Sequence, residues 1–405
     1  MKHNKVQPKD PNEASSSIDK HLQCKPCPCP VTPSRRRNLL ILMNPFSGQG
    51  KASSIYKNYV CPRLLLDKSI ILNPFVTRST GDAASFISTT QINFDGIVII
   101  SGDGLVYEVI NGILSREDGF NVIRNIPLGI VPGGSGNGLA FSILHATHPV
   151  ISSKIKDKKA KKVNPIQQSL DNIIALKQVP LDIIKIETES KTYFSFLSIG
   201  WGLLADMDIE SEHLRFLGGF RFSVWGVIRS LGLRRYRGRL SYLPAVSSVV
   251  QEVEAGVEAG ETTDEKVNEK GGINFVEDKI PSLDQEIPSS WTVIDDHFVM
   301  VYSGHVSHMA SNCFFAPDSR LDDGVIWLLF LKGDISRWDV VRFLTSLESG
   351  KHNSLSYVHM VPVKAFRLEP LDPHVKGVMT VDGEVIVSEK IQATVLPSLA
   401  RIMSR

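Results

Sequence analysis

The sequence has no hydrophobic run long enough to cross a membrane. Its most apolar stretches, such as "VIWLLFL" at residues 325–331, are only as long as a strand, whereas a membrane-spanning helix needs about 20 apolar residues. The first residues, "MKHNKVQPKDPNEASSS", also lack the apolar segment of a secretory signal. We therefore expect a protein that is soluble or that binds a membrane only at its surface.

Cysteine and net charge are scarce as well. The chain has 5 cysteines in 405 residues and a net charge of +2, which excludes a disulfide-rich scaffold and gives no sign of a nucleic-acid partner. Three cysteines crowd into "CKPCPC", as Cys24, Cys27 and Cys29. The prolines between them disfavour a zinc site, so this segment is either a plain disordered tail or a site of reversible palmitoylation.

The pattern of the sequence changes near residue 178. Residues 1–37 are polar and rich in Pro, Ser and Lys, which predicts a disordered tail. Short apolar runs alternate with helical patterns over residues 38–178, whereas residues 179–405 contain mostly short β-rich runs separated by turns. Residues 245–290 are acidic and poor in aromatics, and this composition predicts a disordered insert in the second domain.

These patterns predict an α/β domain followed by an antiparallel one. The alternation in the first domain is typical of a parallel sheet with both faces covered by helices. The short strands of the second domain are typical of an antiparallel sandwich, interrupted by helices around residues 210–235 and at "SRWDVVRFLTSLESG". The last segment could return to the first domain.

Two glycine-rich turns stand where an apolar run gives way to a helical pattern, at Ser101–Gly104 and Gly133–Gly138. Such turns leave backbone N–H groups free to bind anions, phosphate above all. Known phosphate motifs do not match, because Pro45 stands where a Walker A loop needs its first glycine. Two such turns at one sheet edge therefore indicate a polyphosphate ligand held in another way.

Asp103 lies inside the first turn, where a carboxylate would repel phosphate unless it has a task. It could accept a proton from an attacking hydroxyl or hold Mg²⁺. The alternative is a tight turn in which Asp103 only bonds its own backbone. The turn alone leaves both interpretations open.

Six blocks of the sequence together resemble those of the sphingosine kinases, which belong to the diacylglycerol-kinase-like lipid kinases. Along the chain they are "MNPFSGQGKA", "SGDGLVYEVINGIL", "PLGIVPGGSGNGLAFS", "SIGWGLLADMDIESEHLRFLGGFRF", "RRYRGRLSYLP" and "GVMTVDGEVI". The resemblance implies an amino-terminal nucleotide domain like that of phosphofructokinase and NAD kinases, and a β-rich carboxyl-terminal domain that holds a lipid. It also implies an ATP- and Mg²⁺-dependent enzyme that phosphorylates the primary hydroxyl of sphingosine or another sphingoid base, giving sphingosine 1-phosphate.

The resemblance assigns roles to residues by motif. It makes Asp103 the general base and places the head group of the substrate at Ser101, Gly102, Asp103 and Gly104. It assigns no residue to the metal itself, although the turn Asp382–Glu384 would lie near Mg²⁺. The implied nucleotide-binding residues are Asn44, Pro45, Phe46, Thr77, Arg78, Ser79, Thr80, Gly81, Glu108, Gly134, Ser135, Gly136, Arg215, Arg221, Asp382, Gly383 and Glu384.

The implied binding site for the lipid head group includes the segment "ADMDIESE". Asp208 matches the acid that pairs with the ammonium of sphingosine, with Asp206 as the nearby alternative and Asp182 as a structural residue. An 18-carbon tail needs an apolar pocket. The residues that match its lining are Leu204, Met207, Phe222, Cys313, Phe343, Leu344, Leu347 and His352.

Arginines and apolar residues alternate over 221–239, which predicts a basic amphipathic helix suited to an acidic membrane surface or to calmodulin. The alternative is a helix packed on its own sheet. We expect peripheral association with membranes from the cytoplasm, and the sequence leaves open whether the chain forms a homodimer. Two other functions remain: a diacylglycerol or ceramide kinase, whose neutral substrate would offer Asp208 no ammonium partner, and a pseudokinase that acts as an adaptor.

Overall fold

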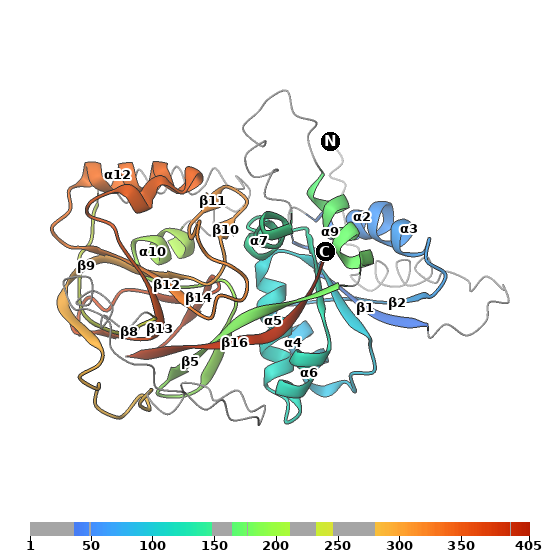
Figure 1. The fold of residues 1–405 in the computed structure, drawn as a ribbon, viewed down its shortest axis with the longest axis horizontal. Coiled ribbons are helices and arrows are strands. Elements are labelled where there is room, and N and C mark those ends of the chain that lie inside the picture. The colour runs from blue at the N-terminus through green and yellow to red at the C-terminus, as the bar shows by residue number, and fades with distance from the viewer. Residues whose placement is uncertain are drawn as a thin grey trace, which may run out of the picture. The chain divides into compact units, whose positions relative to one another are not determined.

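The first four strands form the parallel sheet that the sequence predicts (Figure 1). The computed structural model describes residues 36–47, 50–147, 164–175, 177–210, 232–245, 280–388 and 390–405. The strands are β1 (Arg37–Met43), β2 (Ile70–Val76), β3 (Gly96–Ser101) and β4 (Leu128–Pro132), in the order β2-β1-β3-β4. Both β3 and β4 are buried throughout, as expected for parallel strands covered on both faces.

Helices cover both faces of this parallel sheet (Figure 1). One face packs against α4 (Asp82–Thr89), α5 (Asp103–Leu114) and α6 (Gly119–Asn125). The other face packs against α2 (Ala52–Ile55), α3 (Cys61–Leu64) and α9 (Pro165–Ala175); a π-helical turn, Tyr56–Val60, joins α2 to α3. A further helix, α7 (Gly138–Thr147), follows β4 directly. The carboxyl ends of β3 and β4 therefore lead straight into α5 and α7, at the two glycine turns.

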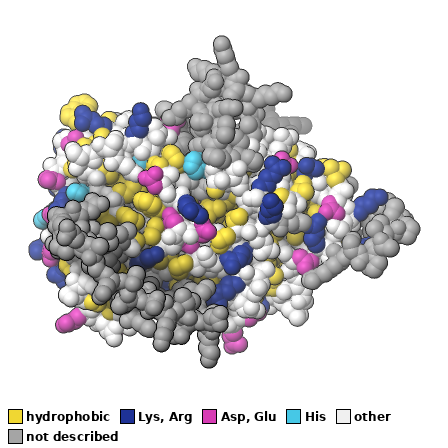
Figure 2. Space-filling model, in the orientation of Figure 1, with side chains coloured by type: hydrophobic (Ala, Val, Ile, Leu, Met, Phe, Trp, Pro, Cys, Tyr) yellow, Lys and Arg dark blue, Asp and Glu magenta, His cyan; other side chains and the backbone are white. Residues whose placement is uncertain are grey.

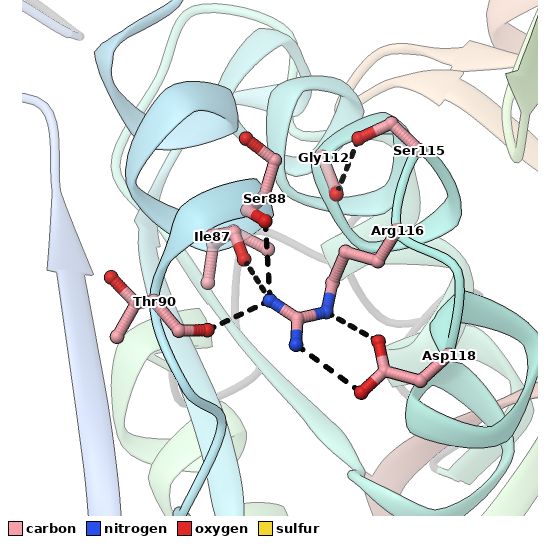
Figure 3. Close-up of polar contacts among 7 residues, drawn as sticks. All are labelled: Ile87, Ser88, Thr90, Gly112, Ser115, Arg116 and Asp118. Atoms are coloured by element: carbon pink, nitrogen blue, oxygen red, sulfur yellow. Dashed lines mark hydrogen bonds and ion pairs between the residues drawn. The ribbon is translucent and has the colours of Figure 1, made fainter.

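Arg116 fastens α4 to the end of α5 (Figure 3). Its Nη1 donates to the carbonyls of Ile87 and Thr90 at 2.8 and 2.7 Å, at the C-terminal end of α4. Its Nε donates to Asp118 at 2.7 Å. A cation suits this position because the C-terminal carbonyls of a helix carry a partial negative charge. Arg116 thus holds the helix that begins at Asp103 against its neighbour.

The remaining strands extend the same sheet and pair mainly antiparallel. All but two of the described strands form one 14-stranded sheet, with the main order β15-β14-β7-β9-β12-β13-β16-β4-β3-β1-β2. Its added members are β5 (Lys177–Thr188), β6 (Thr192–Ser195), β7 (Ser198–Gly202), β8 (Tyr236–Pro244), β9 (Thr292–Gly304), β12 (Ile326–Lys332), β13 (His359–Pro370), β14 (Met379–Val381), β15 (Glu384–Ile386) and β16 (Ile391–Ser404). Two short strands, β10 (His308–Ala310) and β11 (Cys313–Phe314), form a hairpin of their own.

The last strand joins the two halves of this sheet. β16 pairs antiparallel with β5 and β13, and near its end Ile402 pairs in parallel with Leu128 of β4. β5 begins at Lys177 and the sheet continues across residue 178, so the predicted domain boundary stays a prediction.

An apolar cluster lies beside the antiparallel strands, beneath two helices. The helices are α10 (Leu203–Glu210), which follows β7, and α12 (Arg337–Ser346), which begins with a capping box between Ser336 and Asp339. Among the described residues, no helix is long and apolar enough to cross a membrane. Figure 2 shows Lys and Arg side chains intermingled with acidic and hydrophobic ones on the described part of one face, in keeping with the net charge of +2.

One prediction about the basic segment is wrong. Residues Tyr236–Pro244 form strand β8 rather than part of a helix, because "YRGRLSYL" alternates polar and apolar residues with the period of a strand. Arg239 lies on this strand and pairs with Asp295 of β9 at 3.2 Å. Residues 211–231 of the helix predicted around 210–235 lie outside the described residues, as do residues 1–35 of the predicted tail and residues 246–279 of the acidic insert predicted at 245–290.

Candidate active site

The two glycine turns pack directly against each other. The N–H of Gly133 donates to the carbonyl of Ser101 at 2.9 Å. A Cβ placed on Gly134 would lie 2.2 Å from the Cα of Gly102, closer than any side chain can approach. The glycines therefore allow the two backbones to touch, as the parallel sheet predicts for turns at its carboxyl edge.

The segment after β1 joins the same place. The hydroxyl of Ser47 accepts the N–H of Gly102 at 3.2 Å. Asn44 precedes it and accepts the N–H of Phe46 at 2.9 Å, a turn that Pro45 shares. The Phe46 side chain is 77% exposed beside these turns. The sequence did not single out Ser47.

The segment Thr77–Gly81 follows β2 at the same edge of the sheet. Thr77 is buried, and its N–H donates to the carbonyl of Met43 at the end of β1. The chain then turns through Arg78, Ser79 and Thr80 into α4, and Gly81 takes a φ of +83°, which favours glycine. Strands β1, β2 and β4 thus end next to predicted nucleotide-binding residues, and β3 ends at the residues predicted to meet the head group of the substrate.

Asp103 connects the two glycine turns. Its carboxylate accepts the N–H of Gly138 at 2.8 Å and that of Leu139 at 3.2 Å, at the start of α7. A Cβ on Gly136 would lie 2.9 Å from Asp103 Oδ2. Burial raises the pKa of Asp103 above its ordinary value, and the backbone N–H groups oppose this rise. A carboxylate has about four lone-pair sites, so two accepted bonds leave it able to accept a proton.

Asn137 holds the shape of the second turn, and the sequence did not identify it. It has a positive φ of 59°, and its side chain both accepts from the N–H and donates to the carbonyl of Gly134, each at 2.8 Å. An asparagine next to glycines was the available signal, because Asn tolerates the left-handed conformation better than most residues. These bonds fix the turn that contains Ser135 and Gly136.

Glu108 lies one helical turn along α5 from Gly104. Its Oε2 is buried, and no residue in the described part of the chain forms a hydrogen bond with it. Buried carboxylate oxygens normally have a partner. Glu108 is therefore suited to bind a hydroxyl or amino group of a ligand.

Asp382 lies deep in the turn between β14 and β15. Its carboxylate accepts from the Ser195 hydroxyl at 2.5 Å and from the N–H groups of Leu197 and Ser198 at 3.0 and 2.9 Å. Burial raises its pKa to about 7, although these bonds act in the opposite direction. Because its oxygens are occupied by these donors, Asp382 here fixes the turn; its predicted role as a nucleotide ligand stays untested.

The turn that Asp382 fixes lies between Asp208 and Gly104. A Cβ on Gly383, whose φ is +87°, would lie 3.3 Å from Asp208 Oδ2. Next along the chain, Glu384 has its Oε1 3.7 Å from a Cβ placed on Gly104. Gly104, the neighbour of Asp103 in the sequence, and Asp208 therefore both lie beside this turn.

Asp208 and Asp206 have different surroundings. Asp206 is buried and accepts the hydroxyl of Tyr236 on β8, which suits a structural role. Asp208 lies near Tyr302, whose pKa is raised by burial and further by the negative charge of Asp208. Of the two acids, Asp208 is the one beside the turn Asp382–Glu384.

The predicted tail-binding residues gather in the apolar cluster. The buried members of the cluster include Phe315 and Val340. Of the predicted residues, Met207, Phe343 and Leu347 are buried members, and Leu204, Cys313 and Leu344 are partly buried and pack against it. His352 is fully buried beside it, with its ring against Phe315 and Phe343 and its Nε2 2.8 Å from the carbonyl of Phe315. Burial lowers the pKa of His352, which favours the neutral form of the ring and suits an apolar environment.

Three predicted residues cannot be placed: Arg215, Arg221 and Phe222 lie outside the described residues. Within the described part of the chain, no group of three or more His, Cys, Asp or Glu side chains could hold a metal ion. Asp182, predicted to be structural, accepts the N–H groups of Gly324 and Ser398 at 2.6 Å each.

Comparison with known proteins agrees with this arrangement. The model of the diacylglycerol kinase catalytic domain family matches residues 38–186, and that of the YegS C-terminal NAD kinase beta sandwich-like domain matches residues 289–404. A solved structure of a putative diacylglycerol kinase from Bacillus anthracis str. Sterne has a TM-score of 0.61 at 15% identity, covering 92% of this chain and 97% of that one. The fold is thus that of the diacylglycerol-kinase-like kinases, as the sequence predicts.

Similar curated proteins show to which group of these kinases the chain belongs. Sphingosine kinase 1 of Caenorhabditis elegans is 35% identical over 385 residues, covering 88% of this chain and 79% of that protein. Sphingosine kinase 1 of Homo sapiens is 34% identical over 382 residues, covering 92% and 90%, and sphingosine kinase 1 of Arabidopsis thaliana is 32% identical, covering 88% and 70%. The chain belongs to the sphingosine kinase family.

Proposed function

We propose that the protein transfers the γ-phosphoryl group of ATP to the primary hydroxyl of a sphingoid base, with Asp103 as the general base. The observation that carries this proposal is the position of the turn Asp382–Glu384, which lies beside Gly104 on one side and beside Asp208 on the other. A hydroxyl near Asp103 and an ammonium near Asp208 could then belong to one small amino-alcohol head group.

The glycine turns bind the phosphates of ATP. The N–H groups of Ser135 and Gly136 lie in the turn before α7, where the helix dipole favours anions. Those of Gly134, Gly138 and Leu139 are bonded to Asn137 and Asp103 and shape this turn. Glu108, with its unpartnered oxygen among the described residues, accepts a donor from the nucleotide. Arg215 and Arg221 add positive charge from the segment outside the described residues.

Asp103 accepts the proton of the substrate hydroxyl as its oxygen attacks the γ-phosphorus. The bond from that phosphorus to the bridging oxygen breaks, and ADP leaves with the electron pair. A carboxyl whose pKa is raised by burial holds the accepted proton better than an exposed one. The N–H groups of Gly138 and Leu139 orient the carboxylate, so that most of the catalytic effect comes from positioning and fixed dipoles.

The carboxylate near Gly104, together with the phosphates of ATP, is compatible with a bound Mg²⁺. Mg²⁺ keeps several waters and is commonly held by one or two carboxylates and the substrate phosphates. Glu384 is exposed beside Gly104 and could supply one carboxylate oxygen. The ion would neutralise charge on the transferred phosphoryl group.

The lipid binds with its ammonium at Asp208 and its tail in the apolar cluster. Burial of each methylene contributes about 0.8 kcal/mol, so a long chain binds strongly there.

Because sphingoid bases reside in bilayers, the protein meets a membrane surface, and the arginines of residues 221–239 are the candidate contact. Binding to acidic vesicles should weaken from roughly 0.05 M to 0.5 M salt; equal binding would count against electrostatic docking, and calmodulin binding to this segment is a separate proposal.

One assay separates these possibilities. Labelled γ-phosphate is offered with sphingosine, diacylglycerol or ceramide to the wild type and to Asp103→Asn. We expect transfer to sphingosine by the wild type, with a large loss in the variant. Preferred transfer to diacylglycerol or ceramide would identify the other lipid kinases, and an inactive wild type would indicate an adaptor.

A further inference from the structure

The hairpin β10–β11 contacts the phosphate-binding turn through its backbone. The N–H of Ser311, at its tip, donates to the carbonyl of Gly136 at 3.0 Å. Next to it, Asn137 and Ala310 pair as an isolated antiparallel bridge. The second glycine turn therefore carries hydrogen bonds to a segment more than 160 residues away in the sequence.

Ser142 on α7 ties the start of this helix to the base of the hairpin. Its hydroxyl donates to the carbonyl of Gly138 and accepts the N–H of His308, both at 2.9 Å. The side chain is only 2% exposed. A Cβ on Gly138 would lie 2.7 Å from the carbonyl oxygens of His308 and Met309. The start of α7, which also donates to Asp103, therefore has little room to move independently of the hairpin.

The other side of the hairpin belongs to the apolar cluster. Met309 packs both against the core that contains α5 and α7 and against the cluster proposed to hold the lipid tail. Cys313 of β11 packs against the same cluster, and Phe315, two residues further on, is a buried member of it. Figure 1 shows the hairpin next to α7. The hairpin is thus in contact with both proposed binding regions at once.

We propose that Ser142 is a positioning residue through which the hairpin makes the phosphate-binding turn sensitive to the lipid tail. This inference rests on the proposed function. A tail that enters the cluster displaces Met309 and its neighbours. The hairpin moves with them and shifts Gly136, Asn137 and Gly138, which it contacts. We take this change to tighten the turn around the nucleotide. Because coupling between two sites is reciprocal, sphingosine and nucleotide then raise the affinity for each other by the same factor.

The test measures the dissociation constant of AMP-PNP, a non-hydrolysable ATP analogue, with and without sphingosine in detergent micelles. The ratio of the two constants is the coupling factor. We expect a factor of about 5 or more for the wild type, at the lower end of ordinary couplings. In Ser142→Ala the factor should fall to about 1, and in Ser142→Thr, which keeps a hydroxyl, it should return toward the wild-type value.

Two further variants separate coupling from stability. Ser169→Ala removes an equally buried serine on α9 and should leave the factor unchanged. Met309→Ala weakens the contact from the lipid side without removing a backbone hydrogen bond, and it too should lower the factor while the affinity for AMP-PNP alone stays near wild type. This variant serves if Ser142→Ala does not fold.

A wild-type factor of 1 would overturn the proposal, and so would an unchanged factor in both Ser142→Ala and Met309→Ala. A direct measurement of sphingosine binding without nucleotide distinguishes this outcome from failure of the proposed function, in which the wild type would bind no sphingosine. That result would overturn both proposals.

Discussion

The carboxylate of Asp103 accepts the backbone N–H of Gly138 at 2.8 Å, which joins the two glycine turns through one side chain. Asp103 therefore stabilises the start of α7 in addition to any part in the reaction. Measurements of activity alone cannot separate these two roles. Variants that keep or remove the hydrogen bond can.

Asp103→Asn keeps an oxygen that can accept the N–H of Gly138 but cannot take a proton from a hydroxyl. We expect kcat to fall by about 10²- to 10⁴-fold, the usual contribution of a general base. Asp103→Ala should be equally inactive and also less stable by about 1–3 kcal/mol, because the N–H groups of Gly138 and Leu139 lose their partner. Steady-state kinetics and urea unfolding measure both effects. Substantial activity in Asp103→Asn would refute the assignment of the base.

The contact between the turns predicts opposite effects of alanine at two glycines. In Gly134→Ala the new Cβ meets the backbone of Gly102 at 2.2 Å, so the turns must separate, and we expect a loss of stability above about 2 kcal/mol. In Gly104→Ala the Cβ has only Glu384 near it, at 3.7 Å, and alanine is favoured over glycine within a helix by about 0.5–1 kcal/mol. Thermal unfolding of both variants tests this. A comparable loss in Gly104→Ala would contradict the geometry.

Local patterns predicted much of this architecture. Buried strands at residues 96–101 and 128–132 are continuous apolar runs that end in glycines, and such runs are typical of parallel strands. Given parallel strands, the meeting of the two turns follows from topology. The strand nature of "YRGRLSYL" was also readable from its alternation, but the arginines suggested a basic helix instead.

Contacts between distant segments could not be predicted in the same way. Nothing in the sequence around Ser195 or Asp382 indicates that the two are bonded, because that pairing depends on the order of β14 and β7 in the sheet. The same holds for Ser142 and His308. Such residues were visible in advance only where a family motif named them, as "VDGE" did for Asp382, and then with a ligand role in place of the hydrogen bonds seen here.

Asp382 predicts how stability depends on pH. Burial raises its pKa in the folded state to about 7, above the ordinary value of 3.8. The folded protein therefore binds a proton between about pH 7 and pH 4 that the unfolded chain does not, so this group adds stability as the pH falls through that range. Asp382→Asn cannot titrate, and the advantage of the wild type over it should be about 1–3 kcal/mol larger at pH 5 than at pH 8. Urea unfolding at both pH values gives the difference, and parallel profiles would show that Asp382 has an ordinary pKa.

Asp208 predicts the selectivity of the enzyme. In Asp208→Asn the ammonium of sphingosine would lose the charged partner proposed for it, and we expect KM for sphingosine to rise about 10- to 100-fold, from a charged hydrogen bond of about 1.5–3 kcal/mol. KM for ATP should change little. Asp206→Asn is the matched control: it disturbs the bond with Tyr236 and should lower stability rather than raise KM selectively. If the two variants exchanged these effects, Asp206 would be the head-group ligand.

The contacts of Arg116 predict that replacing this residue lowers the free energy of unfolding. Arg116→Ala removes the cation from the C-terminal end of α4 and leaves the carbonyls of Ile87 and Thr90 without it, so we expect a loss of about 1–3 kcal/mol in urea unfolding. Arg116→Lys keeps the charge near the helix end but not the fork that also reaches Asp118, and it should recover only part of the loss. Because α4 and α5 pack closely at Gly112, where a Cβ would lie 2.9 Å from Ala84, the loosened helix should raise KM for ATP without abolishing turnover. An Arg116→Ala protein as stable as the wild type would mean that this contact contributes nothing to the packing of α4 on α5.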